Sequence, residues 1–333
     1  MENIWFSLLQ YARWTPSPHN VQAWKLKIIS DSSAELYYDP KRLLPVTDPT
    51  GCFSVMGFAM FVDSLNIASS KYGKEIQVEY EKKPFDFTSK DLILFAQLTL
   101  IDRKTPEEFS PELIKERRTS RLPYNNVPVP EKEIDILQKI GEKYGQHFFT
   151  SSEEGMVKWI MDLNRDTLFY DMGDEHARKE IGNLLRYNES LAREKKDGLW
   201  SYCFHIPGWF MKLFFDYEKF FELPIIKHIL LAYYETTMKG TRTVAWIQGP
   251  FKTFDDYINA GLALNRIWLK MQDLNLYLHP FGSVITNPNA HDRLREKFKL
   301  NEEKEMVWLL LRVGYSEEPP RSLRLDVDDI LIK

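Results

Sequence analysis

Cysteine is scarce in this chain of 333 residues, in which Cys52 and Cys203 are the only two. Two thiols in a chain of this size indicate neither a disulfide framework nor a zinc site. Both are expected to be buried or chemically inert.

Long hydrophobic runs are also missing. No stretch of about 18 uncharged apolar residues occurs, so no integral membrane segment is expected. The N-terminus has no basic region, and the apolar stretch after it is broken by Gln10 and Arg13, which argues against a signal peptide. We therefore expect a cytoplasmic protein.

Neither sign of charge is in large excess. The net charge of −4 argues against nucleic acid as a partner, because a protein that neutralises phosphates needs a basic face. The seven histidines are scattered, and no pair has metal-ligand spacing with a supporting cysteine or carboxylate, so no metal site is predicted. A Walker loop, a Rossmann glycine fingerprint and a nucleophile elbow are all missing.

Two series of secondary-structure elements are predicted from the hydrophobic periodicity. The first has helices at 4–12 and 57–70 and strands at 24–28, 34–38, 76–80 and 92–100. The second has helices at 111–116, 132–144, 156–170, 257–274 and 290–298 and strands at 243–248 and 306–313. A charged linker around 105–110 separates the series, so we expect halves at 1–110 and 111–333. A loop is expected at 279–283.

An internal echo links the two series. Gly57-Phe58-Ala59-Met60 with Leu65 matches Gly261-Leu262-Ala263-Leu264 with Leu269, and both segments are predicted to be long buried helices followed by a strand. Two core helices can share such a pattern by chance. Duplication would give an α+β fold in which two related halves form a pseudo-dimer, with their central helices packed together and antiparallel-type sheets outside.

A polar turn lies between the first helix and the first strand. It reads Pro16-Ser17-Pro18-His19-Asn20-Val21-Gln22-Ala23-Trp24. Such a turn can present Ser17 and Asn20 to the polar edge of a flat ring. Taken alone, it is equally explained by an Asx-type turn that caps the strand.

Arginine is concentrated in two further segments. Arg117-Arg118-Thr119-Ser120-Arg121 combines three guanidinium groups with two hydroxyls, which can hold a phosphate by forked hydrogen bonds. Pro319-Pro320-Arg321-Ser322-Leu323-Arg324 lies in an extended tail. Either segment alone could be a solvated basic stretch.

Together, these segments resemble the nitroreductase family of FMN flavoproteins. The family carries a motif close to Pro-Ser-x-x-Asn-x-Gln-Pro-Trp, and Arg-Arg-Ser-x-Arg followed by Pro-Val-Pro, here Pro128-Val129-Pro130. The end of the family's chains resembles Val313-Gly314-Tyr315 with the Pro-Pro-Arg tail. Ala23 replaces the usual proline and Thr119 the usual serine; neither change removes a donor. The resemblance covers most of the chain but not its middle.

The order of the motifs is unusual for that family, because the turn precedes the arginine motif by a hundred residues. This order is similar to that of the fused, single-chain Acg-type members. The resemblance implies one composite FMN site per chain, with the turn from the first half and the arginines from the second. The second site is expected to be lost, because the second half has no Pro-Ser-x-x-Asn at Gln146 to Thr150. A monomer is expected, since the dimer is fused within the chain.

The resemblance also implies roles for individual residues. Arg117, Arg118 and Thr119 would hold the FMN phosphate and ribityl chain, and Arg121 would lie near the N1–C2=O edge of the flavin. Pro16, Ser17 and Asn20 would shape the turn and contact the ring. The remaining implied residues are Gly282 and Ser283 on the N5 side and Arg321 and Arg324 over the phosphate.

The middle segment, about 197–239, is rich in aromatic residues and least similar to the family. It could be a lid over the flavin that selects flat aromatic substrates or excludes them. Helices that bury an ordinary apolar stripe explain it equally well, and peripheral membrane contact is a third possibility.

The leading functional hypothesis is an FMN-dependent oxidoreductase. NAD(P)H would donate hydride, and a nitroaromatic, quinone or similar flat small molecule would be the acceptor, with ping-pong kinetics. In this hypothesis the flavin carries the chemistry, so no catalytic side chain is assigned. A non-catalytic stress protein that sequesters FMN under a closed lid is the alternative, and a degenerate, flavin-free interaction protein is the third.

Overall fold

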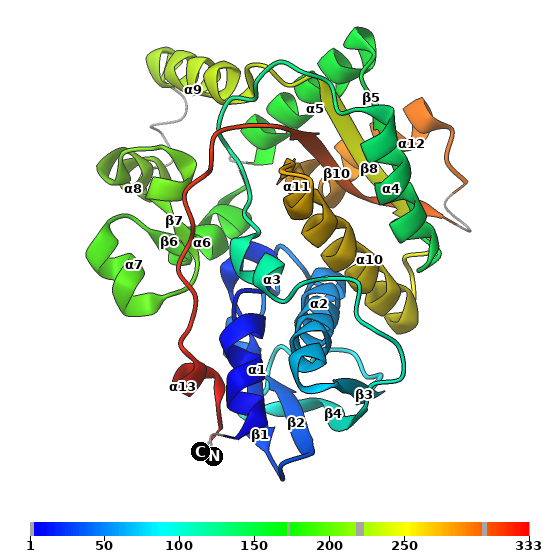
Figure 1. Cartoon of the computed structure of the whole chain (residues 1–333). Helices are drawn as coiled ribbons and strands as arrows, with labels where there is room; N and C mark the ends of the chain where they lie inside the picture. Colours follow the sequence, from blue (N-terminus) through cyan, green and yellow to red (C-terminus); the bar gives the residue numbers. More distant parts are fainter. Residues whose placement is uncertain (1–2, 172–173, 218–222, 302–304, 333) are drawn as a thin grey trace.

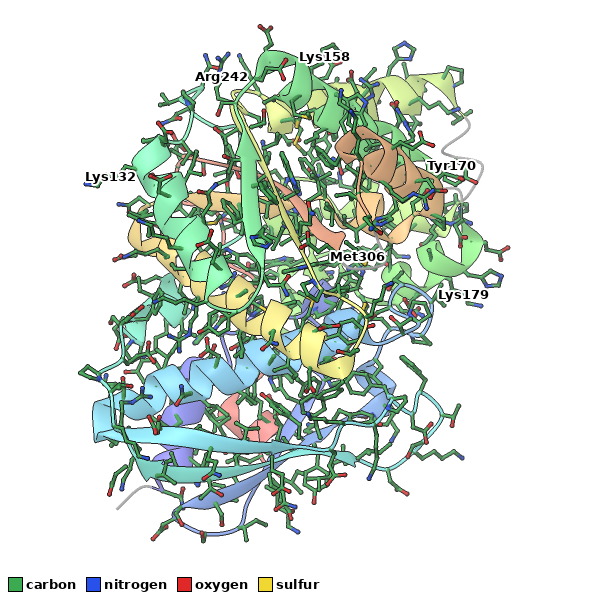
Figure 2. The ribbon with its side chains drawn as sticks, turned by 90° about the vertical axis from the view of Figure 1, so that its right-hand side faces the viewer. Lys132, Lys158, Tyr170, Lys179, Arg242 and Met306 are labelled. Carbon is green, nitrogen blue, oxygen red and sulfur yellow. The ribbon has the colours of Figure 1, made fainter. Side chains whose placement is uncertain are left out.

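The computed structural model describes residues 3–171, 174–217, 223–301 and 305–332. Two four-stranded antiparallel sheets lie on opposite sides of two long helices (Figure 1 and Figure 2). The two helices are α2 (Cys52–Ser69) and α10 (Phe254–Asp273). The expected α+β class with packed central helices is confirmed.

Both sheets have the same topology. The first has the order β1-β2-β4-β3 and the second β5-β8-β10-β9, so each places the first, second, fourth and third strands of its series side by side. The first sheet comprises β1 (Trp24–Ile28), β2 (Ser33–Tyr38), β3 (Lys74–Tyr80) and β4 (Ile93–Asp102). The second comprises β5 (His147–Ser151), β8 (Thr243–Gly249), β9 (Tyr277–Pro280) and β10 (Met306–Gly314).

The helices follow the same repeat. In each half one helix precedes the first strand, α1 (Ile4–Ala12) or α4 (Glu131–Glu142), and the central helix lies between the second and third strands. The repeated order and topology support two related halves, while the boundary at 110/111 stays a prediction. Short helix α3 (Glu112–Glu116) follows that boundary.

A long insertion interrupts the second repeat. β1 and β2 are joined by residues 29–32, whereas β5 and β8 are joined by residues 152–242. This insertion begins well before the aromatic segment predicted at 197–239. Its described elements are α5 (Glu154–Asp171), α6 (Glu175–Asn183), β6 (Leu185–Arg186), α7 (Glu189–Lys195), β7 (Leu199–Trp200), η4 (Ser201–Phe204), α8 (Gly208–Asp216) and α9 (Pro224–Met238). Trp209, in α8, is 71% exposed. Part of the predicted segment, residues 218–222, lies outside the described residues.

The prediction of a loop at 279–283 is wrong. His279 and Pro280 belong to β9, which pairs with β10, and Gly282 begins α11 (Gly282–Thr286). Phe281 explains the difference, because its side chain is buried and its N–H donates to the Leu310 carbonyl at 2.7 Å. Helix α12 (Pro288–Phe298) follows α11.

The two central helices approach each other closely at Gly261. A Cβ added at Gly261 would lie 2.6 Å from the Met56 carbonyl oxygen and 2.7 Å from Ala59 Cβ. Helix α2 is apolar on nearly every side and almost wholly buried, as expected of a helix enclosed by its own protein. Among the described residues, Cys52–Tyr72 is the one helical stretch long and apolar enough to span a membrane by length and composition. Most of this stretch is buried inside the protein.

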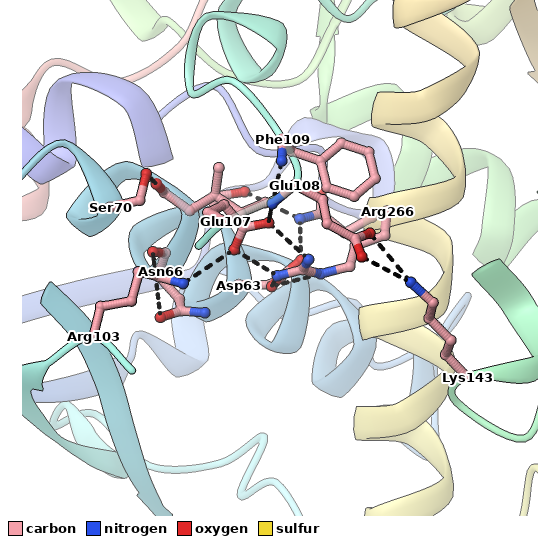
Figure 3. Close-up of polar contacts among 12 residues, drawn as sticks. Asp63, Asn66, Ser70, Arg103, Glu107, Glu108, Phe109, Lys143 and Arg266 are labelled. Carbon is pink, nitrogen blue, oxygen red and sulfur yellow. Dashed lines mark hydrogen bonds and ion pairs between the residues drawn. The ribbon is translucent and has the colours of Figure 1, made fainter. Parts of the chain in front are cut away.

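A buried ion-pair network joins the two helices (Figure 3). Asp63 of α2 accepts from Arg266 of α10 at 2.8 Å, and Arg266 also donates to Glu107 at 2.9 Å. Burial raises the pKa of Asp63, and the Arg266 charge opposes that rise. Two surface hollows of about 290 and 510 Å³ lie in this region, and their lining residues include Glu108 and Ile140 but no predicted cofactor residue.

The C-terminal tail returns to the first half. It runs down one side of the molecule from β10 to α13 (Val327–Ile330), beside α1 and β1 (Figure 1). Leu325, Val327 and Ile330 join the hydrophobic core of the first half, and the Ile332 N–H donates to the Leu26 carbonyl at 2.8 Å. The tail therefore fastens the two halves together.

Replacement of Gly261 by alanine tests the close helix contact. Because the new methyl group would overlap backbone and side-chain atoms of α2, Gly261→Ala should lower the free energy of unfolding by about 1–3 kcal/mol. The matched control is Gly182→Ala in α6, where the added Cβ would meet only Phe215 Cδ1 at 3.8 Å. Chemical denaturation should find the control unchanged or stabilised by up to about 1 kcal/mol. Equal stability of Gly261→Ala and the parent would contradict the contact.

Candidate functional site

The turn between α1 and β1 adopts a conformation that hydrogen bonds hold in place. It contains η1 (Pro18–Asn20), and the φ angles of His19, Asn20 and Gln22 are 45°, 58° and 52°. Non-glycine residues seldom adopt positive φ, and they concentrate at functional sites. Ser17 Oγ accepts from the Gln22 N–H at 3.0 Å, which closes the turn.

Asn20 reaches out of the turn rather than capping the strand. Its Nδ2 donates to the carbonyls of Gly198 and Leu323, each at 3.1 Å. Its Oδ1 is buried and has no hydrogen-bond partner among the described residues. The turn thus joins the insertion and the tail, and it leaves one acceptor free.

Arg117 and Arg118 lie between α3 and the second sheet. Arg117 is 5% exposed, donates to the Trp14 carbonyl at 3.3 Å, and lies 4.2 Å from the centre of the Trp268 ring. Arg118 donates to the Pro319 carbonyl at 2.8 Å and forms an ion pair with Glu318 at 2.5 Å. The following residue, Thr119, forms a parallel bridge with Leu278 of β9.

The tail adds two arginines, and α1 is followed directly by another. Arg321 lies 3.3 Å from the centre of the Trp14 ring, and buried Arg324 donates to Ser322 Oγ at 2.6 Å. Arg13, the residue after α1, donates to the Arg324 carbonyl at 3.4 Å and pairs with Asp326 at 3.1 Å. We call Arg13, Arg117, Arg118, Arg321 and Arg324 the arginine cluster.

The members of the arginine cluster repel one another. Burial, with repulsion from Arg324 and Arg321, holds the pKa of Arg117 well below its ordinary value. Burial lowers the pKa of Arg321 to about 10, with contributions from Arg118 and Arg13. Burial and Arg321 together lower the pKa of Arg324 to about 10. With pKa values of about 10, Arg321 and Arg324 remain protonated near neutral pH, so positive charge is concentrated here.

Several donors of this cluster are also unused. Arg13 Nε, Arg118 Nε, Arg321 Nη2 and Arg324 Nε are buried and have no hydrogen-bond partner among the described residues. The Thr15 hydroxyl, between α1 and the turn, is in the same state. Buried donors without partners are rare in proteins, and buried positive charge with free N–H groups is the environment that a phosphate needs.

Arg121 belongs to a neighbouring group. Its guanidinium lies 4.0 Å from the centre of the Phe204 ring in η4. Burial lowers the pKa of His19 and of His279, and the positive charge of Arg121 contributes in both cases. Burial raises the pKa of the Cys203 thiol, while the charges of Arg121 and Arg324 lower it. The charges of both Arg121 and Arg324 therefore act on Cys203.

Most of the predicted site residues therefore come together, although their roles toward a flavin stay predictions. Three segments of the chain meet and carry Pro16, Ser17, Asn20, Arg117, Arg118, Arg321 and Arg324. Burial, and with it the charge of Arg121, lowers the pKa of His19 in the turn. Gly282 and Ser283 are instead the first residues of α11, which packs against α5, α12 and β10. A Cβ added at Gly282 would meet no atom within 4 Å.

Sequence reasoning missed Arg13, Gln22, Cys203 and Phe204 as site residues. Arg13 could have been found, because it stands three residues before the motif. Cys203 and Phe204 are brought to the site by the insertion, and Gln22 of the turn bonds to the insertion and the tail, whose paths carry no local signal.

The corresponding place in the second half is built differently. Residues 13–23 connect α1 to β1, whereas only residues 143–146 connect α4 to β5. Gln146 at this connection is buried, accepts from Trp308 Nε1 at 2.8 Å and donates to the Pro250 carbonyl at 3.3 Å. An equivalent of the polar turn does not occur there.

The chain thus combines two α+β repeats of the same topology with a buried arginine cluster, and known proteins resemble it. No family model matches the chain. The chain is 22% identical over 307 residues to "Probable NAD(P)H nitroreductase PigM" of a Serratia species, a match that covers 88% of this chain and 83% of that protein. It is 30% identical over 122 residues to "Putative NAD(P)H nitroreductase acg" of Mycobacterium tuberculosis, which covers 37% of this chain and 36% of that protein. The resemblance to nitroreductases, with Acg-like relatives, is therefore confirmed.

Solved structures of nitroreductases are more distant. The FMN-dependent nitroreductase NfnB of Mycobacterium smegmatis, solved with NADPH, is 15% identical and covers 63% of this chain and 92% of its own, with a TM-score of 0.36. A "putative nitroreductase" of Desulfovibrio desulfuricans, solved with FMN, is 12% identical and covers 67% of this chain and 94% of its own, with a TM-score of 0.38.

Removal of one arginine from the cluster should stabilise the flavin-free protein, because it relieves the repulsion. Because a buried, poorly paired charge destabilises a fold, Arg324→Met should raise the melting temperature of the flavin-free protein by about 2–4 °C. Inorganic phosphate should stabilise the parent protein by binding its folded form, and should stabilise this variant less.

Thermal unfolding with and without phosphate checks this prediction. Arg295→Met on α12 is the control, because its ion pair with Asp292 is exposed and should matter little. A variant that is less stable than the parent and equally responsive to phosphate would contradict the electrostatic account.

Proposed function

We propose that this chain binds one FMN at the arginine cluster and acts as an NAD(P)H-dependent oxidoreductase on flat acceptors such as nitroaromatics and quinones. The observation that carries the proposal is the group of buried N–H donors without partners on Arg13, Arg118, Arg321 and Arg324. The similarity of this chain to proteins named as NAD(P)H nitroreductases supports the proposed NAD(P)H-dependent reduction.

The residues present fit the cofactor. The phosphate of FMN carries negative charge and several acceptor oxygens, which complement the arginine cluster and the Thr15 hydroxyl. The free Oδ1 of Asn20 is an acceptor, and the edge of the flavin ring offers an N–H donor to such a group. The cluster would orient the phosphate end of the cofactor, while the turn would contact the ring.

Arg121 has a second task in this proposal. When bound, the flavin would accept hydride from NAD(P)H and pass reducing equivalents to the acceptor, in ping-pong order. A fixed guanidinium beside the ring would favour its anionic reduced form. Arg121 is suited to this task because its guanidinium is stacked on the Phe204 ring, and its surroundings lower its pKa chiefly through burial.

One observation favours the alternative of FMN sequestration. Phe204 lies on Arg121, and the Tyr233 hydroxyl donates to the Phe204 carbonyl, so the insertion reaches the predicted ring position. A segment held in this way would limit access of acceptors to the flavin. Both versions of the proposal describe a monomer, since the two halves that form the site are already joined. Both also place the protein in the cytoplasm.

The phosphate assignment is tested by the double substitution of Arg117 and Arg118 by alanine. Loss of two charged groups should remove about 3–6 kcal/mol of binding free energy, so the variant should be purified without FMN. The charge-matched control is the double substitution of Arg293 and Arg295 on α12 by alanine. Flavin content after denaturation is the measurement, and full occupancy in the Arg117 and Arg118 variant would refute the assignment.

Catalysis is separated from sequestration by turnover. The FMN-loaded protein should oxidise NADPH or NADH when menadione is supplied, with parallel double-reciprocal plots as the substrates are varied. Bound flavin without turnover would support sequestration and contradict the oxidoreductase proposal. Intersecting lines would contradict the ping-pong order alone.

A further inference from the structure

Gln22 is a junction between three segments that are far apart in the sequence. Its side chain is 0% exposed. Its Nε2 donates to the Lys196 carbonyl at 3.0 Å and to the Asn20 carbonyl at 3.3 Å. Its Oε1 accepts from the Leu325 N–H at 2.9 Å. One amide thus holds the turn, the insertion and the tail.

The contact with the tail lies next to the arginine cluster. Leu325 directly follows Arg324, whose carbonyl accepts from Arg13 at 3.4 Å. On the other side of Arg324, the Leu323 carbonyl accepts from Asn20 at 3.1 Å. Asn20 and Gln22 therefore fix the backbone on both sides of Arg324.

The contact with the insertion continues the same junction. Lys196 pairs with Asp326 of the tail, and Asp197 pairs with Arg42 at 3.0 Å and with Arg186 at 2.5 Å. The Gly198 N–H donates to the Asn20 carbonyl at 3.1 Å. Segment 196–198 is therefore fastened to the turn and to the tail at once.

Glutamine is chemically suited to this position. Its amide both donates and accepts, and removal of either function would leave a buried backbone group without a partner. The φ of 52° also restricts the choice of residue, since among non-glycine residues asparagine and aspartate adopt this conformation most readily.

We propose that Gln22 is a positioning residue that sets the affinity for the phosphate end of the cofactor, although it does not contact the phosphate. The amide fixes the tail at Leu325, and this contact holds Arg324 and Arg321 toward Arg13, Arg117 and Arg118. The inference rests on the proposed FMN site and adds that recognition of its phosphate depends on one neutral side chain.

The test compares FMN with riboflavin, which lacks the phosphate. In Gln22→Asn the side chain is one methylene shorter and cannot reach both the tail and the insertion, while the residue still adopts positive φ. Loss of a well-aimed charged contact should weaken FMN binding by about tenfold or more. Riboflavin affinity should change less. The dissociation constant of riboflavin divided by that of FMN should therefore fall. Quenching of flavin fluorescence on addition to the flavin-free protein measures both constants.

Gln146→Asn is the matched control. Gln146 is equally buried and bonds to Trp308 and Pro250 at the corresponding connection of the second half. This variant should lose comparable stability and keep the parent's ratio. Gln22→Met, which fills the space without hydrogen bonds, serves the same comparison if Gln22→Asn does not fold.

The outcomes separate the inference from the function on which it rests. A parent protein that binds neither flavin overturns the proposed function and this inference with it. A parent that prefers FMN, together with an unchanged ratio in the Gln22 variants, overturns the inference alone. An equal fall in Gln146→Asn overturns it too, because general destabilisation would then explain the effect.

Discussion

Five arginines meet where three separate segments of the chain cross, and their mutual repulsion is the constraint to which the surrounding structure responds. Arg13 follows the first helix, Arg117 and Arg118 follow α3 in the second half, and Arg321 and Arg324 lie in the tail. Among the described residues, only Glu318 and Asp326 form ion pairs with the cluster. Held together without an anion, such charges oppose folding. Contacts around the cluster therefore hold the arginines together. These contacts are the packed tail, the hydrogen-bonded turn, and the rings of Trp14 and Trp268 stacked on Arg321 and Arg117.

The two halves share a topology but differ in the connection between the helix and the first strand. Both sheets have the same strand order, and the central helices meet at Gly261 and at the buried pair of Asp63 with Arg266. The polar turn exists in the first half alone, because the second half connects its helix and strand through residues 143–146. Gln146 and Trp308 fill that region. The proposal of a single composite site rests on this difference in the length of one connection.

Much of this architecture could be predicted from the sequence. Alternation and helical periodicity placed the strands of the first sheet and both central helices within a few residues, because their burial is governed by local pattern. The motif residues of the turn and of 117–121 were recognisable since their chemistry lies in adjacent positions. The strand at 277–280 was missed because its pairing with β10 depends on Phe281 being buried by distant residues. The roles of Gln22, Cys203 and Phe204 depend on the insertion and the tail, whose path has no signature within the sequence.

The number of FMN molecules bound per chain tests the account most directly. The protein should be purified, denatured to release its flavin, and the flavin identified and quantified against the protein concentration. The account predicts FMN at one molecule per chain, held by the turn of the first half and the arginine cluster. Two molecules per chain would contradict the loss of the second site, and a protein that fails to take up added FMN would contradict the proposed function.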